Sequence, residues 1–323
     1  MNQIAKEKYK LFCQQTYVPI FSKPWWLDAI CGPDNWGVWL YEKGENILAA
    51  LPYYTERRDK YWYITKALLT QNNGLIIYYP PEQKICKRQE YEEEIIKAAV
   101  KFIVSLNMDV YEQQYHYEFS NFLPFFWEDF AVIPRVTYVI EDTSDMQRII
   151  DNFSSNYKNK IRKGERNIAC FRSVPWDIFY EEHEKIFKRQ GLQCPFTFKQ
   201  WQKLWEVCAE ENAGDIIAAC SGDGTILSLA FLAKDEKSEY LLLGGNIPEH
   251  ASMQTYTALV KKCIQIASER GLKFDFEGSM IQRINHSFRE YGGTPKLYYR
   301  IRKVFNPDII RAEAEERIRQ LGG

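Results

Sequence analysis

One order of strands and helices occurs twice along this chain, and this repetition constrains the fold more than any other feature. Residues 134–140 (PRVTYVI) align with residues 295–301 (PKLYYRI), and residues 47–48, which follow a charged turn, resemble residues 226–227. Chance supplies either match alone, but both fall at equivalent places in the same series of elements. We therefore predict a duplicated structure with two similar halves.

The first half is predicted to begin with a helix and to continue as an antiparallel meander. Proline suits the first helical turn, so a helix is predicted from Pro24 to Ile30. Segments rich in aromatic and aliphatic residues, separated by turn-forming or charged residues, predict strands. These strands are expected at residues 37–41, 47–54, 61–69, from about 109 and at 132–140, with a helix at 91–106.

The second half shows a similar order. A hairpin is predicted around residues 221–224, and Gly271 is expected to end the long helix with a left-handed cap. The predicted elements are strands at residues 215–220, 226–233 and 240–243, a helix at 253–270, a strand at 273–276, a helix at 281–291 and a strand at 295–301. This pattern predicts an α/β (α+β) protein in which each half has a mixed, largely antiparallel sheet flanked by helices.

The predicted domains are residues 1–143, residues 144–305 and a C-terminal helix at 306–323. The second domain includes a helical linker at about residues 144–167 that has no counterpart in the first half. Asn306, Pro307 and Asp308 supply a cap, a first-turn proline and a first-turn acid for the last helix. We expect that helix to pack back on the body.

Composition narrows the classes of function. The 323 residues carry a formal net charge of -1, so a site for polyanions would need a local cluster of cations. Neither the eight cysteines nor the four histidines show the spacing of a metal site, and the thiols are expected to be reduced. No window approaches 18 uncharged apolar residues, and the N-terminus is polar, so we expect a cytoplasmic protein without a membrane span.

Three common catalytic patterns are absent from the sequence. It contains no G-x-x-x-x-G-K-[ST] phosphate loop, no G-x-G-x-x-G and no G-x-S-x-G. Nucleotide hydrolysis, Rossmann redox chemistry and serine hydrolysis therefore lose most of their support. Acyl transfer to an amine needs less conspicuous residues, namely a groove, backbone donors for the oxyanion and one base.

The candidate catalytic residues are Glu277, Ser279 and Arg289. A predicted strand ends at Gly278, where a ligand or a neighbouring backbone can approach, so Glu277 and Ser279 are expected near a sheet end, with Asp275 as a substrate-binding residue. The alternative is that Asp275 and Glu277 are solvent-facing strand positions. Arg289 is predicted where a helix turns back toward the sheet, and its guanidinium suits phosphate or carboxylate.

Further candidate substrate-binding residues lie in the predicted linker and in the first half. Residues 157–166 hold five cations on a predicted helix, including Arg162, Lys163 and Arg166, which suit phosphate groups, although a solvated face is the alternative. Gln71 and Tyr115 lie at strand ends of the first half that correspond to the candidate site of the second half.

The basic segment at residues 159–166, the strand and turn at 274–279 and residues 288–293 (FREYGG) together resemble the FemAB-like branch of the acetyltransferase (GNAT) superfamily. The resemblance covers about half of the chain and implies two tandem GNAT-like domains. It also implies a substrate channel between the halves, with Arg162 and Arg289 as contacts for phosphate or an intermediate. Residues 244–252 differ from the usual pyrophosphate loop of the superfamily, so the resemblance does not imply acetyl-CoA as the donor.

The resemblance implies an N-acyltransferase or aminoacyltransferase that moves an acyl group from a thioester or aminoacyl ester to an amine. No bound cofactor is expected; acyl-CoA or aminoacyl-tRNA would be the cosubstrate, and tRNA or an acyl carrier would be the partner. The acceptor is expected to be a small-molecule or cell-envelope precursor amine. Two alternatives remain: a noncatalytic ligand- or RNA-binding protein on a duplicated GNAT fold, and nonspecific nucleic-acid binding through the basic segment.

Overall fold

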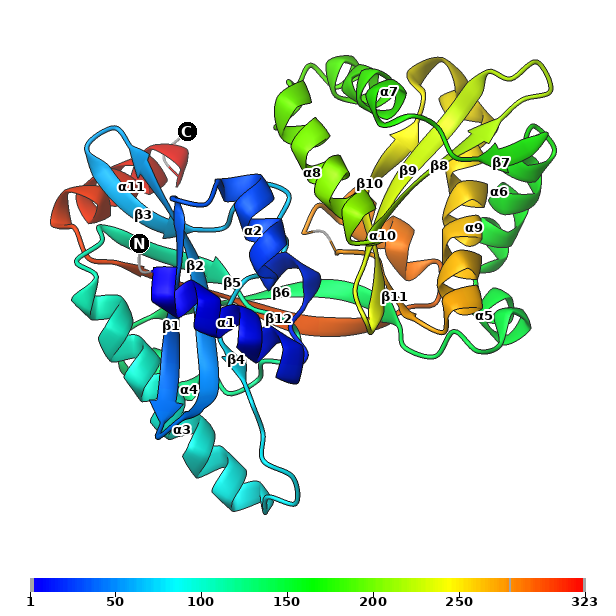
Figure 1. Ribbon diagram of the computed structural model, residues 1–323. Coiled ribbons are helices and arrows are strands. Elements are labelled where there is room, and N and C mark those ends of the chain that lie inside the picture. The colour runs from blue at the N-terminus through cyan, green and yellow to red at the C-terminus, as the bar shows by residue number, and fades with distance from the viewer. Residues whose placement is uncertain (1–2, 279, 322–323) are drawn as a thin grey trace. The chain divides into compact units, whose positions relative to one another are not determined.

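The computed structural model describes residues 3–278 and 280–321, and the chain divides into two compact units. Unit 1 comprises residues 1–135 and 298–323, and unit 2 comprises residues 136–297. Figure 1 shows both units as sheets with flanking helices, which confirms the predicted fold class.

Unit 1 is built on the meander that the sequence predicts. Its strand order is β1-β2-β3-β5-β12, with the short β4 paired to β2. β3 and β5 are parallel, and β12 is antiparallel to β5. Its elements are α1 (Gln3–Gln15), η1 (Ile20–Ser22), α2 (Pro24–Cys31), β1 (Trp36–Lys43), β2 (Asn46–Arg58), β3 (Tyr61–Thr65), β4 (Ile76–Ile77), α3 (Ile85–Ser105), β5 (Val110–Gln114), α4 (Leu123–Trp127), β12 (Thr294–Val304) and α11 (Pro307–Leu321).

The helices of unit 1 cover its sheet with apolar residues at helical spacing. α3, in the region where the sequence predicts a helix, buries Ile95, Ile96, Ala99, Val100 and Ile103. These side chains belong to one core with Tyr111 and Tyr115 of the β5 region and with Ile301 of β12. A second core forms where α1 and α2 pack beside β1.

Unit 2 has the strand order β6-β11-β10-β9-β8-β7. β10 and β11 are parallel, whereas the other pairs are antiparallel. Its elements are β6 (Ala131–Ile140), α5 (Met146–Asn152), α6 (Ser155–Glu165), β7 (Cys170–Arg172), α7 (Trp176–Arg189), α8 (Phe198–Glu210), β8 (Gly214–Cys220), β9 (Ile226–Lys234), β10 (Ser238–Asn246), η2 (Pro248–Met253), α9 (Thr255–Arg270), β11 (Lys273–Asp275) and α10 (Gln282–Arg289).

The last strand of each predicted repeat completes the sheet of the other unit. β6 ends the first repeat in sequence, but its Val139 and Ile140 pair with β11 of unit 2. β12 ends the second repeat, but residues 300–304 pair with β5 of unit 1. The boundaries therefore fall within these two strands, at 135/136 and 297/298, and not at the predicted 143/144 and 305/306.

Most other expectations agree with the structure. Gly271 adopts φ 67° and caps α9 as predicted, and the hairpin β8–β9 surrounds residues 221–224. The predicted linker is not a connector between units, because α6 packs along α9 and contributes to the core of unit 2. α1, α4, α7, α8, β4 and β7 were not predicted.

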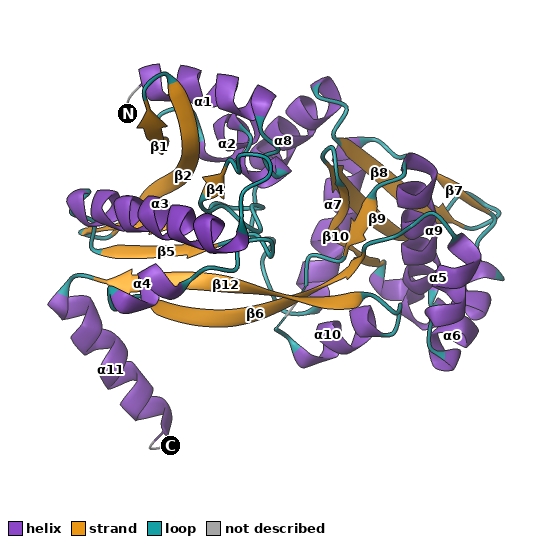
Figure 2. Cartoon of the chain, turned by 90° about the horizontal axis from the view of Figure 1, so that it is seen from below, coloured by secondary structure: helices purple, strands orange, loops and turns teal. Residues whose placement is uncertain are grey.

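α11 begins at Pro307 as predicted, but it is only loosely attached. Ile309 is buried and Glu313 forms an ion pair with Arg302 of β12, whereas Ile310 and Ile318 are exposed. Figure 2 shows α11 leaving the end of β12 and extending away from the sheet of unit 1. Among the helices of the described residues, none combines the length and the apolar character needed to cross a membrane.

Candidate functional site

Two parallel strands separate in the middle of unit 2. β10 and β11 are paired from Ser238/Lys273 to Tyr240/Asp275. Beyond this point β10 bulges between Leu241 and Leu243 and continues along β9 to Asn246. The chain after β11 instead follows β6, because the Phe276 N–H donates to the Tyr138 carbonyl. The carboxyl ends of these two strands therefore diverge, which is the place where open α/β sheets bind ligands.

The turn after β11 is held tightly against β6. The Oδ1 atom of Asp275 accepts hydrogen bonds from Thr137 Oγ1 at 2.6 Å and from the Glu277 N–H at 2.8 Å. Gly278 has φ 49°, and a Cβ there would collide with the Val136 carbonyl oxygen. The sequence predicts that a ligand or a neighbouring backbone approaches Gly278. The structure shows the approach of a neighbouring backbone, that of Val136.

Asp275 is not a solvent-facing strand position, so that alternative is wrong for this residue. Asp275 is 4% exposed, and burial raises the pKa of its carboxyl to about 6 while the Thr137 hydrogen bond opposes the shift. Glu277 is half-buried and adopts a left-handed backbone, φ 59°, a strained conformation for a residue other than glycine. Asp275 thus anchors the turn that presents Glu277. Ser279 lies outside the described residues.

Arg289 lies in the last turn of α10, on its exposed side. Its Nη2 atom is 2.9 Å from His286 Nδ1 and 3.6 Å from Glu290 Oε1. α10 packs on the turn after β11 through Phe288, whose ring centroid is 5.2 Å from that of Phe276. Arg289 is therefore on an element that contacts the candidate site, with its guanidinium in solvent.

The basic segment forms α6, whose buried face packs on α9. Tyr157, Ile161 and Gly164 face inward, and Arg162, Lys163 and Arg166 are exposed. A Cβ on Gly164 would lie 2.5 Å from the carbonyl oxygen of Gln254, the residue just before α9. The cationic end of α6 therefore lies beside the amino end of α9.

The amino end of α9 is capped from within the chain. Asn246, the last residue of β10, accepts hydrogen bonds through Oδ1 from the Tyr256 N–H at 2.9 Å and from Thr255 Oγ1 at 3.2 Å. One backbone donor that could bind a phosphate is thus already in use.

The two candidates of unit 1 lie in different surroundings. Tyr115 is fully buried, its hydroxyl lies 2.7 Å from that of Tyr111, and its ring packs against Gly74. Its side chain therefore belongs to the core and does not face a ligand. Gln71 is half-buried, and its carbonyl accepts a hydrogen bond from Gln114 Nε2 at 2.7 Å.

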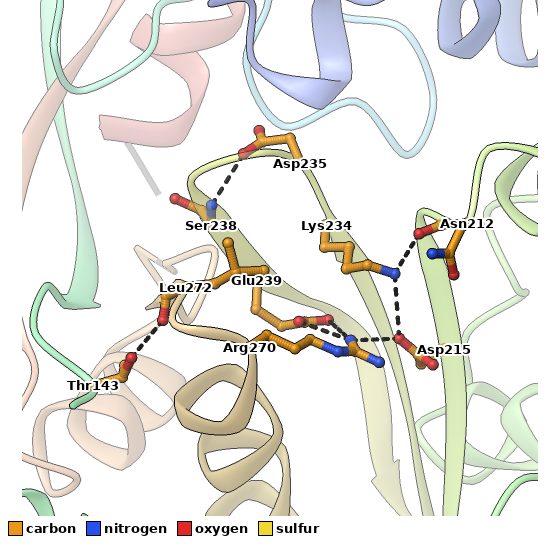
Figure 3. Close-up of polar contacts among 9 residues, drawn as sticks. All are labelled: Thr143, Asn212, Asp215, Lys234, Asp235, Ser238, Glu239, Arg270 and Leu272. Carbon is orange, nitrogen blue, oxygen red and sulfur yellow. Dashed lines mark hydrogen bonds and ion pairs between the residues drawn. The ribbon is translucent and has the colours of Figure 1, made fainter. Parts of the chain in front are cut away.

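A buried ionic network at the other end of β10 was not predicted from the sequence. Glu239 is fully buried, and Arg270 Nη1 lies 2.9 Å from its Oε2 and 2.6 Å from Asp215 Oδ2 (Figure 3). Burial raises the pKa of Glu239 to about 7, and the Arg270 hydrogen bonds oppose the shift. The network joins the end of α9 to β8 and β10, so we interpret it as structural. The sequence places Glu239 in an apolar strand, but no sequence pattern indicates that Arg270 pairs with it.

The burial of His183 on α7 was also not predicted from the sequence. It is 3% exposed, and its ring stacks with those of Phe179 and Phe196 at centroid distances of 5.3 and 5.8 Å. Burial lowers its pKa to about 4, so the imidazole is neutral near pH 7. No cluster of His, Cys, Asp and Glu side chains among the described residues is arranged to hold a metal ion.

Residues 151–280, which lie within unit 2, match the family model described as an acetyltransferase (GNAT) domain. The divergent strands and the Asp275–Gly278 turn lie within the matched residues. No curated protein matches the sequence significantly.

Solved structures extend the likeness to the whole chain. The structure of FemX superposes with a TM-score of 0.68 at 10% identity, over 92% of this chain and 96% of that one. L-PGS from Bacillus licheniformis gives a TM-score of 0.56 at 11% identity, over 98% and 96% of the two chains. A tandem GNAT protein from the clavulanic acid biosynthesis pathway gives 0.52 at 10% identity, over 95% and 96%. The chain has the tandem GNAT fold that the FemAB-like resemblance predicts.

Proposed function

We propose that this protein transfers an acyl or aminoacyl group from a thioester or ester donor to an amine. The observation that carries the proposal is the divergence of β10 and β11 within the matched GNAT domain, next to the strained turn that presents Glu277. The FemX-like fold and the likeness to the C-terminal domain of a putative lysylphosphatidylglycerol synthetase from Agrobacterium fabrum, with a TM-score of 0.57 at 11% identity, support it.

In the proposed reaction the amine nitrogen attacks the donor carbonyl carbon, and the carbon–sulfur or carbon–oxygen bond to the carrier then breaks. The Glu277 carboxylate accepts the proton that the amine loses and passes it to the departing sulfur or oxygen, so the carrier leaves as a thiol or an alcohol. Positioning of the two substrates supplies much of the rate. Asp275 acts as a positioning residue, because it binds the Glu277 N–H and fixes the turn.

The donor is proposed to carry phosphates that contact the cationic end of α6. Lys163 and Arg166 are exposed beside the amino end of α9, where Asn246 accepts a hydrogen bond from the Tyr256 N–H. Both acyl-CoA and aminoacyl-tRNA have such phosphates. Arg289 is a further candidate for a phosphate or carboxylate contact.

Two variants separate catalysis from donor binding. Glu277→Gln should lower kcat about 100-fold or more and leave donor affinity unchanged, since one general base contributes about 10²–10⁴-fold. Lys163→Ala combined with Arg166→Ala should weaken donor binding and reduce its salt dependence. Lys199→Ala, which removes an exposed cation from α8, is the control and should change neither. Full activity of Glu277→Gln would refute its role as the base.

A further inference from the structure

Two cysteines lie opposite each other at the β7 edge of the sheet of unit 2. Cys170 on β7 and Cys220 on β8 are register partners in an antiparallel pair. Opposed residues of antiparallel strands have Cα atoms about 4.5–5.5 Å apart. A disulfide spans Cα separations of about 4.4–6.8 Å. The backbone therefore holds the two Cα atoms at a separation that a disulfide can bridge.

Both thiols lie on the same face of the sheet. Phe171 and Ala219, which are also opposed, pack into the core of unit 2. Because side chains alternate along a strand, their neighbours Cys170, Arg172 and Cys220 project to the opposite face. A hydrogen bond from Arg172 Nε to Cys220 Sγ at 3.3 Å agrees with this assignment.

The two cysteines differ in their exposure to solvent. Cys170 is exposed, whereas Cys220 is fully buried and contacts the Arg172 guanidinium. A reagent in solution therefore reaches Cys170 first. The hydrogen bond from Arg172 Nε holds the Cys220 sulfur in place on the face that also carries Cys170.

We propose that Cys170 and Cys220 form a reversible thiol–disulfide pair that reacts with low-molecular-weight disulfides. The Cys170 thiolate attacks the reagent disulfide, forms a mixed disulfide and releases one reagent thiol. The Cys220 sulfur then loses its proton, attacks Cys170 Sγ and releases the second reagent thiol. The protein loses two protons and two electrons, and the reagent disulfide gains them as two thiols.

The bridge would fasten a short edge strand to its neighbour. β7 has three residues and leads from the cationic end of α6, so the bond would fix the chain that follows Arg166. The inference depends only on the geometry of β7 and β8, and it holds whether or not the protein is a transferase.

Oxidised glutathione added to the full-length protein tests the pair. Intact mass and peptide mapping should show a product lighter by two hydrogens, with a peptide containing Cys170 linked to one containing Cys220. Dithiothreitol should reverse the link. Cys170→Ser should abolish it, and Cys86, which is exposed on α3, should form only a mixed disulfide and serves as the internal control.

The role of Arg172 has its own measurement. Arg172→Gln should leave the formation of the mixed disulfide at Cys170 unchanged and slow ring closure about threefold, because it removes the hydrogen bond that positions the Cys220 sulfur. Equal closure rates would refute the role of Arg172. Oxidised protein that carries only mixed disulfides, or that links Cys170 to another cysteine, would overturn the pair itself.

Discussion

His183 shows how a single buried side chain makes stability depend on pH. In the unfolded chain the pKa of His183 returns to about 6.5, whereas burial between Phe179 and Phe196 lowers it to about 4 in the folded protein. The unfolded state therefore binds more protons between these values. The stability that this residue contributes is present above pH 6.5 and is lost as the pH falls to about 4.

His183→Phe should remove this loss, because phenylalanine fills the aromatic site without a titratable group. We expect the wild-type protein to lose about 3 kcal/mol more than the variant between pH 6.5 and pH 4, measured by denaturant unfolding. The raised pKa values of Asp275 and Glu239 act in the opposite direction, but both proteins share them. The same pH slope in both proteins would contradict the account.

Helix α6 was predicted as part of a linker between the halves, but in the structure it packs on α9 within unit 2. Its cations were visible in the sequence, and its three exposed candidates remain candidates for binding. Its role in the core was not visible, because the fit of Gly164 to the Gln254 carbonyl depends on residues 90 positions apart. α7 and α8 were missed although α8 begins with a capping box at Thr197 and Gln200, a signal that the sequence carries.

Gly164→Ala tests the packing of α6 on α9. Within a helix this change ordinarily stabilises by about 0.5–1 kcal/mol. Here we expect a lower free energy of unfolding, by about 1–3 kcal/mol, because the new methyl group would lie 2.5 Å from a backbone oxygen. Asn156→Ala, on the exposed side of α6, should change the free energy of unfolding by no more than about 0.5 kcal/mol. A stabilised Gly164→Ala protein would show that the contact is not tight.

At the scale of the whole molecule, the duplication was predicted from residues 134–140 and 295–301, and the order of elements in both halves agrees with it. The crossing of β6 and β12 between units was not predicted, because pairing partners depend on contacts distant in sequence. The turn at Asp275–Gly278 was predicted from the sequence. The burial of Asp275 was not, because it depends on packing against β6, which is distant in sequence.

Two truncations test this exchange of strands. Removal of residues 307–323 deletes α11 alone, so unit 1 should remain folded with only a small loss of stability. Removal of residues 298–323 also deletes Ile301, which is fully buried in the core of unit 1, and the pairing with β5. Hydrogen exchange in β5 and α3 should then rise strongly, whereas β8–β10 of unit 2 should stay protected. Equal protection of β5 in both truncations would contradict the exchange.

The central claim, transfer of an acyl group to an amine at the turn after β11, is tested most directly by one assay of turnover. The wild-type protein and Glu277→Gln, both shown to be folded, are incubated with acyl-CoA, aminoacyl-tRNA and acyl-carrier donors and a panel of primary amines, and amide products are measured by mass spectrometry. We predict an amide from at least one donor class, formed about 100-fold or more slowly by the variant. No amide from any donor class, or equal rates for the two proteins, would contradict the claim.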